Sequence, residues 1–159
     1  MSHMMARRAF LTLAALVAGA AMLPARLARA LDISDDEWRK KLTSAQYRIL
    51  REHGTERAFS SPLNDEKRAG VFHCAGCNTA LFTSAMKFDS GTGWPSFYDS
   101  LPEVLGTSTD TSYFMTRTEY HCATCKGHHG HVFNDGPQPT GLRYCNNGDA
   151  LVFVAKQGE

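Results

Sequence analysis

Cys74-Ala75-Gly76-Cys77 and Cys122-Ala123-Thr124-Cys125 form two matched C-x-x-C segments, and residues 78–121 separate them. Each segment can present two sulfur atoms from one short loop, and two such loops complete a tetrahedral metal site. Four thiolates favour Zn²⁺, and because protein ligands fill all four positions, none remains for water or substrate. The sequence therefore predicts one structural zinc ion whose binding contributes to folding.

The same four cysteines allow two other interpretations. Four thiolates also bind iron in a rubredoxin-like site, and an exported chain permits disulfide bonds. We favour a metal over disulfides because two matched C-x-x-C segments are a strong metal signal.

The bulk composition is that of one globular domain. The chain has 159 residues, of which 43% are hydrophobic and 21% are charged. Its formal net charge of +1 is unevenly spread, because residues 1–30 contain four arginines and no acid. Residues 31–159 thus carry 13 basic and 16 acidic side chains, a net charge of −3. This balance gives no support to nucleic-acid binding, which requires a basic face.

Residues 1–30 are expected to be a tag remnant and an export signal, with the mature domain in residues 31–159. Residues 1–4 precede a second start methionine, and Arg7-Arg8 resembles a twin-arginine signal. An apolar run at residues 9–23, short for a membrane span, leads to an A-x-A cleavage site at residues 28–30. We expect cleavage near Leu31 and export to the periplasm, with an uncleaved membrane anchor as the alternative.

Local signals predict short N-terminal helices followed by a β domain. Segments 34–37 and 43–46 have the pattern of a capping box, and Gly54 is placed to end the second helix. From residue 71 onward, short β-branched and aromatic runs alternate with turn residues, as in antiparallel strands. These runs are Val71-Phe72, Leu81-Phe82, Tyr113-Phe114-Met115, Val132-Phe133, Leu142 to Tyr144, and Leu151 to Val154. Asn147-Gly148 is predicted to be a hairpin turn joining the last two strands.

The fifth cysteine, Cys145, stands apart from the two pairs. If residues 142–146 are extended, Arg143 and Cys145 project to the same side of the strand. A guanidinium beside a thiol favours the thiolate and lowers the thiol's pKa, which predicts a nucleophile. The alternative is a buried cysteine that acts as a small hydrophobe, although its polar neighbours make a dry core awkward.

Two further groups of residues suggest chemistry. His128, His129 and His131 lie within four residues and could supply extra metal ligands. Because four cysteines already satisfy one ion, acid–base catalysis is the favoured interpretation. Trp94 lies in a Gly/Pro-rich segment, where an indole is either part of the core or an apolar wall for a substrate.

These residues and motifs resemble the methionine-R-sulfoxide reductases of the B type, the MsrB family. The resemblance covers about residues 43–153, including both C-x-x-C segments. Its other motifs are Lys87 to Ser90, Gly93 to Phe97, Gly130 to Phe133, and Pro139 to Asn146. It implies a mainly β fold of two antiparallel sheets, with short N-terminal helices and a structural zinc site of four cysteines. The activity it implies is thiol-dependent reduction of the R epimer of free or peptidyl methionine sulfoxide, a repair of oxidised proteins.

The resemblance also implies roles for single residues. A cysteine nucleophile attacks the sulfoxide sulfur, a histidine protonates the oxygen, and methionine leaves behind a cysteine sulfenic acid. An apolar wall for the methyl group opposite polar groups for the oxygen would select one epimer. The expected catalytic residues are Cys145, His131, His128 and Arg143, and the expected substrate-binding residues are Trp94, Asp135 and Asn147.

Two positions depart from the family pattern. Thr92 stands where many members have a resolving cysteine. We therefore expect an external thiol, either a thioredoxin-like protein or a small thiol, to reduce the sulfenic acid; a zinc-site cysteine could do so only at the expense of the metal. His129 stands where the family usually has an apolar residue, and we expect a tolerated surface change.

The competing function is a zinc-ribbon binding module without catalysis. It accounts for the four paired cysteines but leaves Arg143, Cys145 and Trp94 without a purpose. For either function we expect a monomer.

Overall fold

The computed structural model describes residues 33–157. The predicted tag remnant, export signal and cleavage site lie outside the described residues. Within the described part of the chain, no helix combines the length and the apolarity needed to cross a membrane.

Two short helices open the described chain, as predicted. α1 spans Asp35–Lys41 and α2 spans Ser44–Glu52, and each begins with a complete capping box. The end of α2 differs from the prediction, because His53 rather than Gly54 adopts the left-handed conformation, with φ 54° and ψ 33°. Histidine is among the residues that tolerate this region better than most. The His53 side chain is exposed beside the end of the helix.

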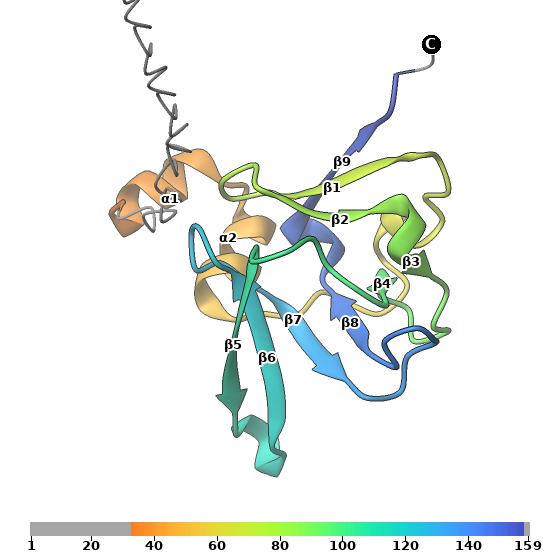
Figure 1. Ribbon diagram of the computed structural model, residues 1–159. Coiled ribbons are helices and arrows are strands. Elements are labelled where there is room, and N and C mark those ends of the chain that lie inside the picture. Colours follow the sequence, from red (N-terminus) through yellow and green to blue (C-terminus); the bar gives the residue numbers. More distant parts are fainter. Residues whose placement is uncertain (1–32, 158–159) are drawn as a thin grey trace, which may run out of the picture.

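The β-strands form two antiparallel sheets, which confirms the predicted fold class (Figure 1). The three-stranded sheet has the order β2-β1-β9, with β1 at Gly70–Cys74, β2 at Ala80–Thr83 and β9 at Leu151–Ala155. The six-stranded sheet has the order β3-β4-β8-β7-β6-β5. Its strands are β3 (Lys87–Phe88), β4 (Ser96–Phe97), β5 (Leu105–Asp110), β6 (Arg117–Cys122), β7 (His128–Phe133) and β8 (Arg143–Asn146).

The connection between the last two strands is not the predicted hairpin. β8 pairs with β4 and β7, whereas β9 pairs with β1 in the other sheet. Between them a short 3₁₀ turn, Gly148–Ala150, carries the chain from one sheet to the other. The prediction was wrong because an Asn-Gly pair favours a hairpin only when both flanking strands belong to the same ladder.

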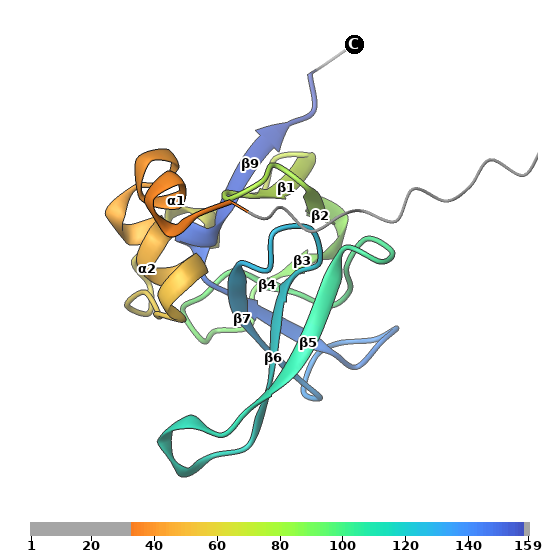
Figure 2. The same ribbon diagram turned by 90° about the vertical axis from the view of Figure 1, so that its left-hand side faces the viewer.

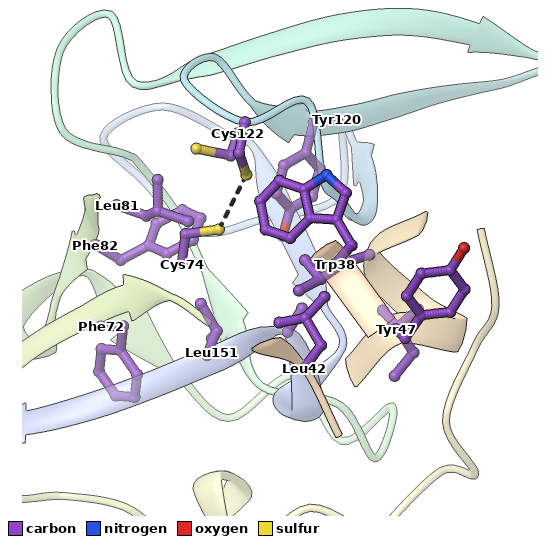
Figure 3. Close-up of a cluster of buried hydrophobic side chains, with 14 of the residues drawn as sticks. Trp38, Leu42, Tyr47, Phe72, Cys74, Leu81, Phe82, Tyr120, Cys122 and Leu151 are labelled. Atoms are coloured by element: carbon purple, nitrogen blue, oxygen red, sulfur yellow. Dashed lines mark hydrogen bonds between the residues drawn. The ribbon is translucent and has the colours of Figure 1, made fainter. Parts of the chain in front are cut away.

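An aromatic stack joins the two sheets. Phe82 of β2 lies parallel to Phe97 of β4, with ring centroids 4.2 Å apart, and Phe72 of β1 meets Phe97 edge-on at 5.0 Å. The helices add Trp38, which is 1% exposed and lies beside two of the paired cysteines in Figure 3. The core therefore connects the sheets, the helices and the predicted metal site.

The β5–β6 hairpin projects away from this core in both views (Figures 1 and 2). Its end carries Tyr113, Phe114 and Met115, which were predicted to form a strand. They instead lie in and beside a 3₁₀ turn, Ser112–Phe114, and their side chains are exposed. An apolar run predicts a strand only where another layer covers it, and no described element covers this one.

Candidate active site and candidate metal centre

The four paired cysteines converge, as predicted. Their sulfur atoms all lie within 4.8 Å of one another, and Cys74 to Cys125 and Cys77 to Cys122 are separated by 3.6 and 3.5 Å. Metal–sulfur bonds of roughly 2.3 Å place tetrahedral ligands about 3.8 Å apart, whereas a disulfide requires about 2.05 Å. All four are free cysteines. The cluster therefore fits a tetrahedral metal ion better than two disulfides.

The two C-x-x-C loops share one backbone geometry. In each loop, the residue after the second cysteine adopts a positive φ: 62° at Asn78 and 61° at Lys126. Its N–H donates to the carbonyl of the first cysteine, at 2.8 Å for Asn78 and 2.9 Å for Lys126. This repeated turn presents both sulfur atoms of each loop to the same point.

A β-bulge in β7 arranges the histidines. Tyr120 pairs with Gly130 and His121 pairs with His128, so His129 is an extra residue in β7. One extra residue reverses the alternation of faces along the strand. His128 and His131 therefore face the same side although they are three residues apart, while His129 faces the core.

The expected surface change at His129 is wrong. The His129 side chain is fully buried, with Nε2 3.3 Å from the sulfur of Cys74 and Nδ1 3.2 Å from Oδ1 of Asn146. Burial lowers the pKa of its imidazole to about 4. A histidine in place of the family's usual apolar residue suggested the surface, but the bulge turns it inward.

A row of polar residues crosses the six-stranded sheet on the face that His128 and His131 share. Cys145 lies directly opposite His131 on the neighbouring strand, and His131 lies opposite Glu119. Ser96 and Ser108 extend the row on β4 and β5. Because residues two apart share a face, Arg143 lies on this side too, as predicted.

Cys145 and His131 open onto one cavity of about 140 Å³. The expected residues Trp94 and Asn147 line the same cavity, which is therefore the candidate active site. Thr55, Arg117, Gly130, Phe133 and Asn146 complete its wall. Two aromatic rings thus stand near a cysteine and a histidine, which suits an apolar group attached to a polar reacting centre.

The pKa of Cys145 differs from the prediction. Burial raises it, and the nearby Arg143 charge and a hydrogen bond from Thr92 only partly oppose that effect. Arg143 therefore acts in the predicted direction, but desolvation of the thiolate is the larger influence. In the resting site the thiol form is favoured beyond what is usual for cysteine.

His131 is held by an acid from the projecting hairpin. Its Nε2 lies 2.7 Å from Oδ2 of Asp110, which also accepts a hydrogen bond of 2.6 Å from Arg117. Burial lowers the pKa of the imidazole, and the hydrogen bond to Asp110 opposes this shift. The Asp110 carboxylate therefore orients the ring and favours its protonated form.

The other expected catalytic histidine, His128, does not line the Cys145 cavity. It lies in a neighbouring cavity of about 650 Å³, where its Nδ1 is 2.9 Å from Oε1 of Glu119. Its ring centroid is 5.6 Å from that of His131. His128 is thus adjacent to the active site rather than in contact with its reacting centre.

Arg143 and Asp135 form a bidentate pair. Nε and an Nη of the guanidinium donate to the two carboxylate oxygens, each at 2.8 Å, and the guanidinium lies 4.3 Å above the Phe133 ring. Neither Arg143 nor Asp135 lines the Cys145 cavity. Asp135 therefore orients Arg143, and the structure does not place it at the expected substrate-binding position.

Glu56 contacts residues of the candidate active site and was missed by the sequence reasoning. The side chain is 6% exposed and accepts hydrogen bonds from the N–H groups of Gly148 and Asp149, at 2.7 and 3.0 Å. Its backbone N–H donates to Asn147 Oδ1, and its carbonyl accepts from Trp94 Nε1. It lies in an irregular segment without periodicity, so no local signal identified it.

Asp110, Arg117 and Glu119 were also missed, although a signal existed. Arg117 and Glu119 alternate with Thr118 and Tyr120 along β6, the pattern of a strand with one polar face. Their position beside His131 follows only from the pairing of β6 with β7, which is not a local property.

Comparison with known proteins agrees with this geometry. The SelR domain model matches residues 42–155. A "Peptide methionine sulfoxide reductase MsrB" from Agrobacterium fabrum is 52% identical over 76% of this chain and 90% of its own length. Proteins of the same name from Methanosarcina barkeri and Thiobacillus denitrificans are 52% and 53% identical, over 82% and 77% of this chain and 96% and 94% of their own lengths. The chain therefore belongs to the SelR domain family, that of the MsrB peptide methionine sulfoxide reductases.

Proposed function

We propose that this chain is a peptide-methionine (R)-S-oxide reductase, which reduces the R epimer of methionine sulfoxide with electrons from a thiol. The observation that carries the proposal is the pairing of Cys145 with His131 on adjacent strands, at a cavity that Trp94 and Phe133 also line. The relatives' names support the substrate, and the cavity supplies a nucleophile, an acid and an apolar wall. A binding module without catalysis would have no use for this arrangement.

The sulfoxide enters with its methyl group against Trp94. The Cys145 thiolate attacks the sulfoxide sulfur and forms a sulfur–sulfur bond while His131 donates a proton to the oxygen, and the proton released by the Cys145 thiol restores the one that His131 gave up. The hydroxyl group then moves from the methionine sulfur to the Cys145 sulfur as the sulfur–oxygen and sulfur–sulfur bonds break, so methionine leaves and Cys145 becomes a sulfenic acid. Asp110 stabilises the protonated imidazole before the transfer, and Arg143 stabilises the thiolate. In the S epimer, the methyl group and the oxygen exchange positions, so the polar oxygen would lie against the indole of Trp94.

The four-cysteine cluster holds one structural Zn²⁺ in this proposal. Zinc suits four thiolates, and it would supply folding free energy by joining the β1–β2 connection to the β6–β7 connection. Metal analysis of the purified protein should give one zinc per chain and four thiols that resist oxidation. A red protein that contains iron, or one without metal and with four oxidised cysteines, would contradict the assignment.

Regeneration requires an external thiol. The described residues contain five cysteines, four of which form the metal cluster, and Thr92 rather than a cysteine lies beside Cys145. A first thiol condenses with the sulfenic acid, releasing water and forming a mixed disulfide. A second thiol then restores Cys145 and leaves with the first as a disulfide. A thioredoxin-like protein or a small thiol can serve, and the enzyme acts as a monomer.

The proposed location is the periplasm, after export by a twin-arginine route and cleavage near Leu31. Support comes from the sequence of residues 5–30. Mass spectrometry of the protein from the periplasmic fraction should find a chain that begins near residue 31. A mature protein that retains residues 5–30 would contradict the cleaved signal.

The reductase activity is tested with both epimers of a methionine sulfoxide peptide and dithiothreitol as the reductant. We expect turnover of the R epimer only, and its loss in Cys145→Ser. Equal turnover of both epimers, or undiminished activity in that variant, would contradict the proposal.

A further inference from the structure

We propose a second metal site, formed by His53, Glu119 and His128, which takes one divalent transition-metal ion such as Zn²⁺ or Co²⁺. Each of the three side chains offers one ligand atom, and these atoms all lie within 4.8 Å of one another. The ligands come from three elements: the end of α2, β6 and β7. The site is separate from the four-cysteine cluster and shares no ligand with it.

The donor set defines the class of ion. Two imidazoles and one carboxylate are the ligands of many zinc sites that keep a position for water, and they also suit cobalt and nickel. Metal bonds of roughly 2.0–2.1 Å place two ligands of one ion about 2.9 Å apart at a right angle and about 3.3 Å apart in a tetrahedron. The gap between Glu119 Oε1 and His128 Nδ1 is already 2.9 Å. An ion can therefore replace the proton that this pair shares.

Glu119 is prepared for such an ion by its other contacts. Its Oε2 accepts a hydrogen bond of 2.7 Å from Ser108 Oγ and lies 3.0 Å from His121 Nδ1. The other oxygen, Oε1, is therefore the one that would bind the proposed ion. Burial alone would raise the pKa of Glu119, but hydrogen bonds from His128, His121 and Ser108 outweigh it and lower the pKa to about 2. The carboxylate is therefore ionised and immobile at neutral pH.

His53 supplies the exposed side of the site. It follows α2 in a left-handed backbone conformation, and its ring centroid lies 5.0 Å from that of His128. All three proposed ligands line the cavity of about 650 Å³, so an ion can reach them from solvent. The two arginines on this wall are engaged elsewhere: Arg117 with Asp110, and Arg48 with the carbonyl of Thr55.

Cobalt titration tests the site, starting from protein that holds one zinc per chain, in the four-cysteine cluster. The visible spectrum of bound cobalt identifies the class of its ligands. We expect one added equivalent of Co²⁺ with visible d–d bands and no thiolate-to-cobalt charge-transfer band. His53→Gln should weaken this binding at least about tenfold, since one of three ligands is lost. Glu52→Gln is the matched control: it alters the neighbouring residue on the same cavity wall and should bind Co²⁺ as the unchanged protein does.

Three results would overturn the proposal. They are the absence of an added equivalent, a charge-transfer band that assigns the ion to a cysteine, and unchanged affinity in His53→Gln. Both variants keep His3 of the N-terminal segment, so any Co²⁺ bound by that residue is the same in the two variants. None of these results bears on the reductase activity, which the epimer assay tests separately.

Discussion

Truncation of the buried Glu56 carboxylate should destabilise the turn that follows Cys145. In Glu56→Ala, the N–H groups of Gly148 and Asp149 lose a charged acceptor. Gly148 is buried, so its unpaired N–H costs about 1.5–3 kcal/mol, whereas Asp149 is exposed and water recovers part of its bond. The expected loss in the free energy of unfolding is roughly 2–4 kcal/mol, a large share of the 5–15 kcal/mol typical of a domain.

Urea denaturation measures this loss from the shift in the transition midpoint at constant slope. Glu52→Ala is the control, because its carboxylate makes one exposed contact of 3.6 Å with Arg39, and such pairs contribute about 0–1 kcal/mol. Glu56→Gln keeps one oxygen but turns an amide N–H₂ toward a backbone N–H. Its loss of unfolding free energy should therefore lie between those of Glu52→Ala and Glu56→Ala. Equal unfolding curves for Glu56→Ala and Glu52→Ala would refute the reasoning.

Three further substitutions probe the active site. Arg143→Ala removes a charge that lowers the pKa of Cys145, so the rising limb of kcat/KM against pH should move to higher pH; a limb that stays or moves to lower pH would contradict that role. Thr92→Cys places a thiol near Cys145, so peptide mapping after one turnover should find a disulfide between positions 92 and 145 that the unchanged chain lacks. Trp94→Ala removes the apolar wall and should lower kcat/KM for the R epimer at least about tenfold, with weaker discrimination between the epimers; unchanged selectivity would mean that another group receives the methyl.

Local signals were sufficient for several parts of the fold and site. The capping boxes that begin α1 and α2 depend on residues three apart in sequence, so they could be read directly. The C-x-x-C spacing likewise predicts the four-cysteine cluster, because each loop brings two sulfur atoms to one point. The strand that holds Arg143 and Cys145 followed from simple alternation.

The remaining features depend on pairing between distant segments. The bulge at His129 exists only relative to β6, so no reading of β7 alone could place His128 and His131 on one face. The turn at Asn147-Gly148 joins two sheets because β9 pairs with β1 rather than with β8. The balance of burial and charge at Cys145 depends on how deeply the fold encloses it, which local sequence does not determine.

The oxygen transferred to Cys145 gives the most direct test of the account. Reduced protein is mixed with one equivalent of an R-epimer methionine sulfoxide peptide, without added thiol, and a sulfenic-acid trapping reagent is then added. The account predicts one methionine formed per chain and a trapped sulfenic acid at Cys145, with the four paired cysteines unmodified. Methionine formation with no adduct at Cys145, or with Cys145 bridged to Cys74, Cys77, Cys122 or Cys125, would contradict it.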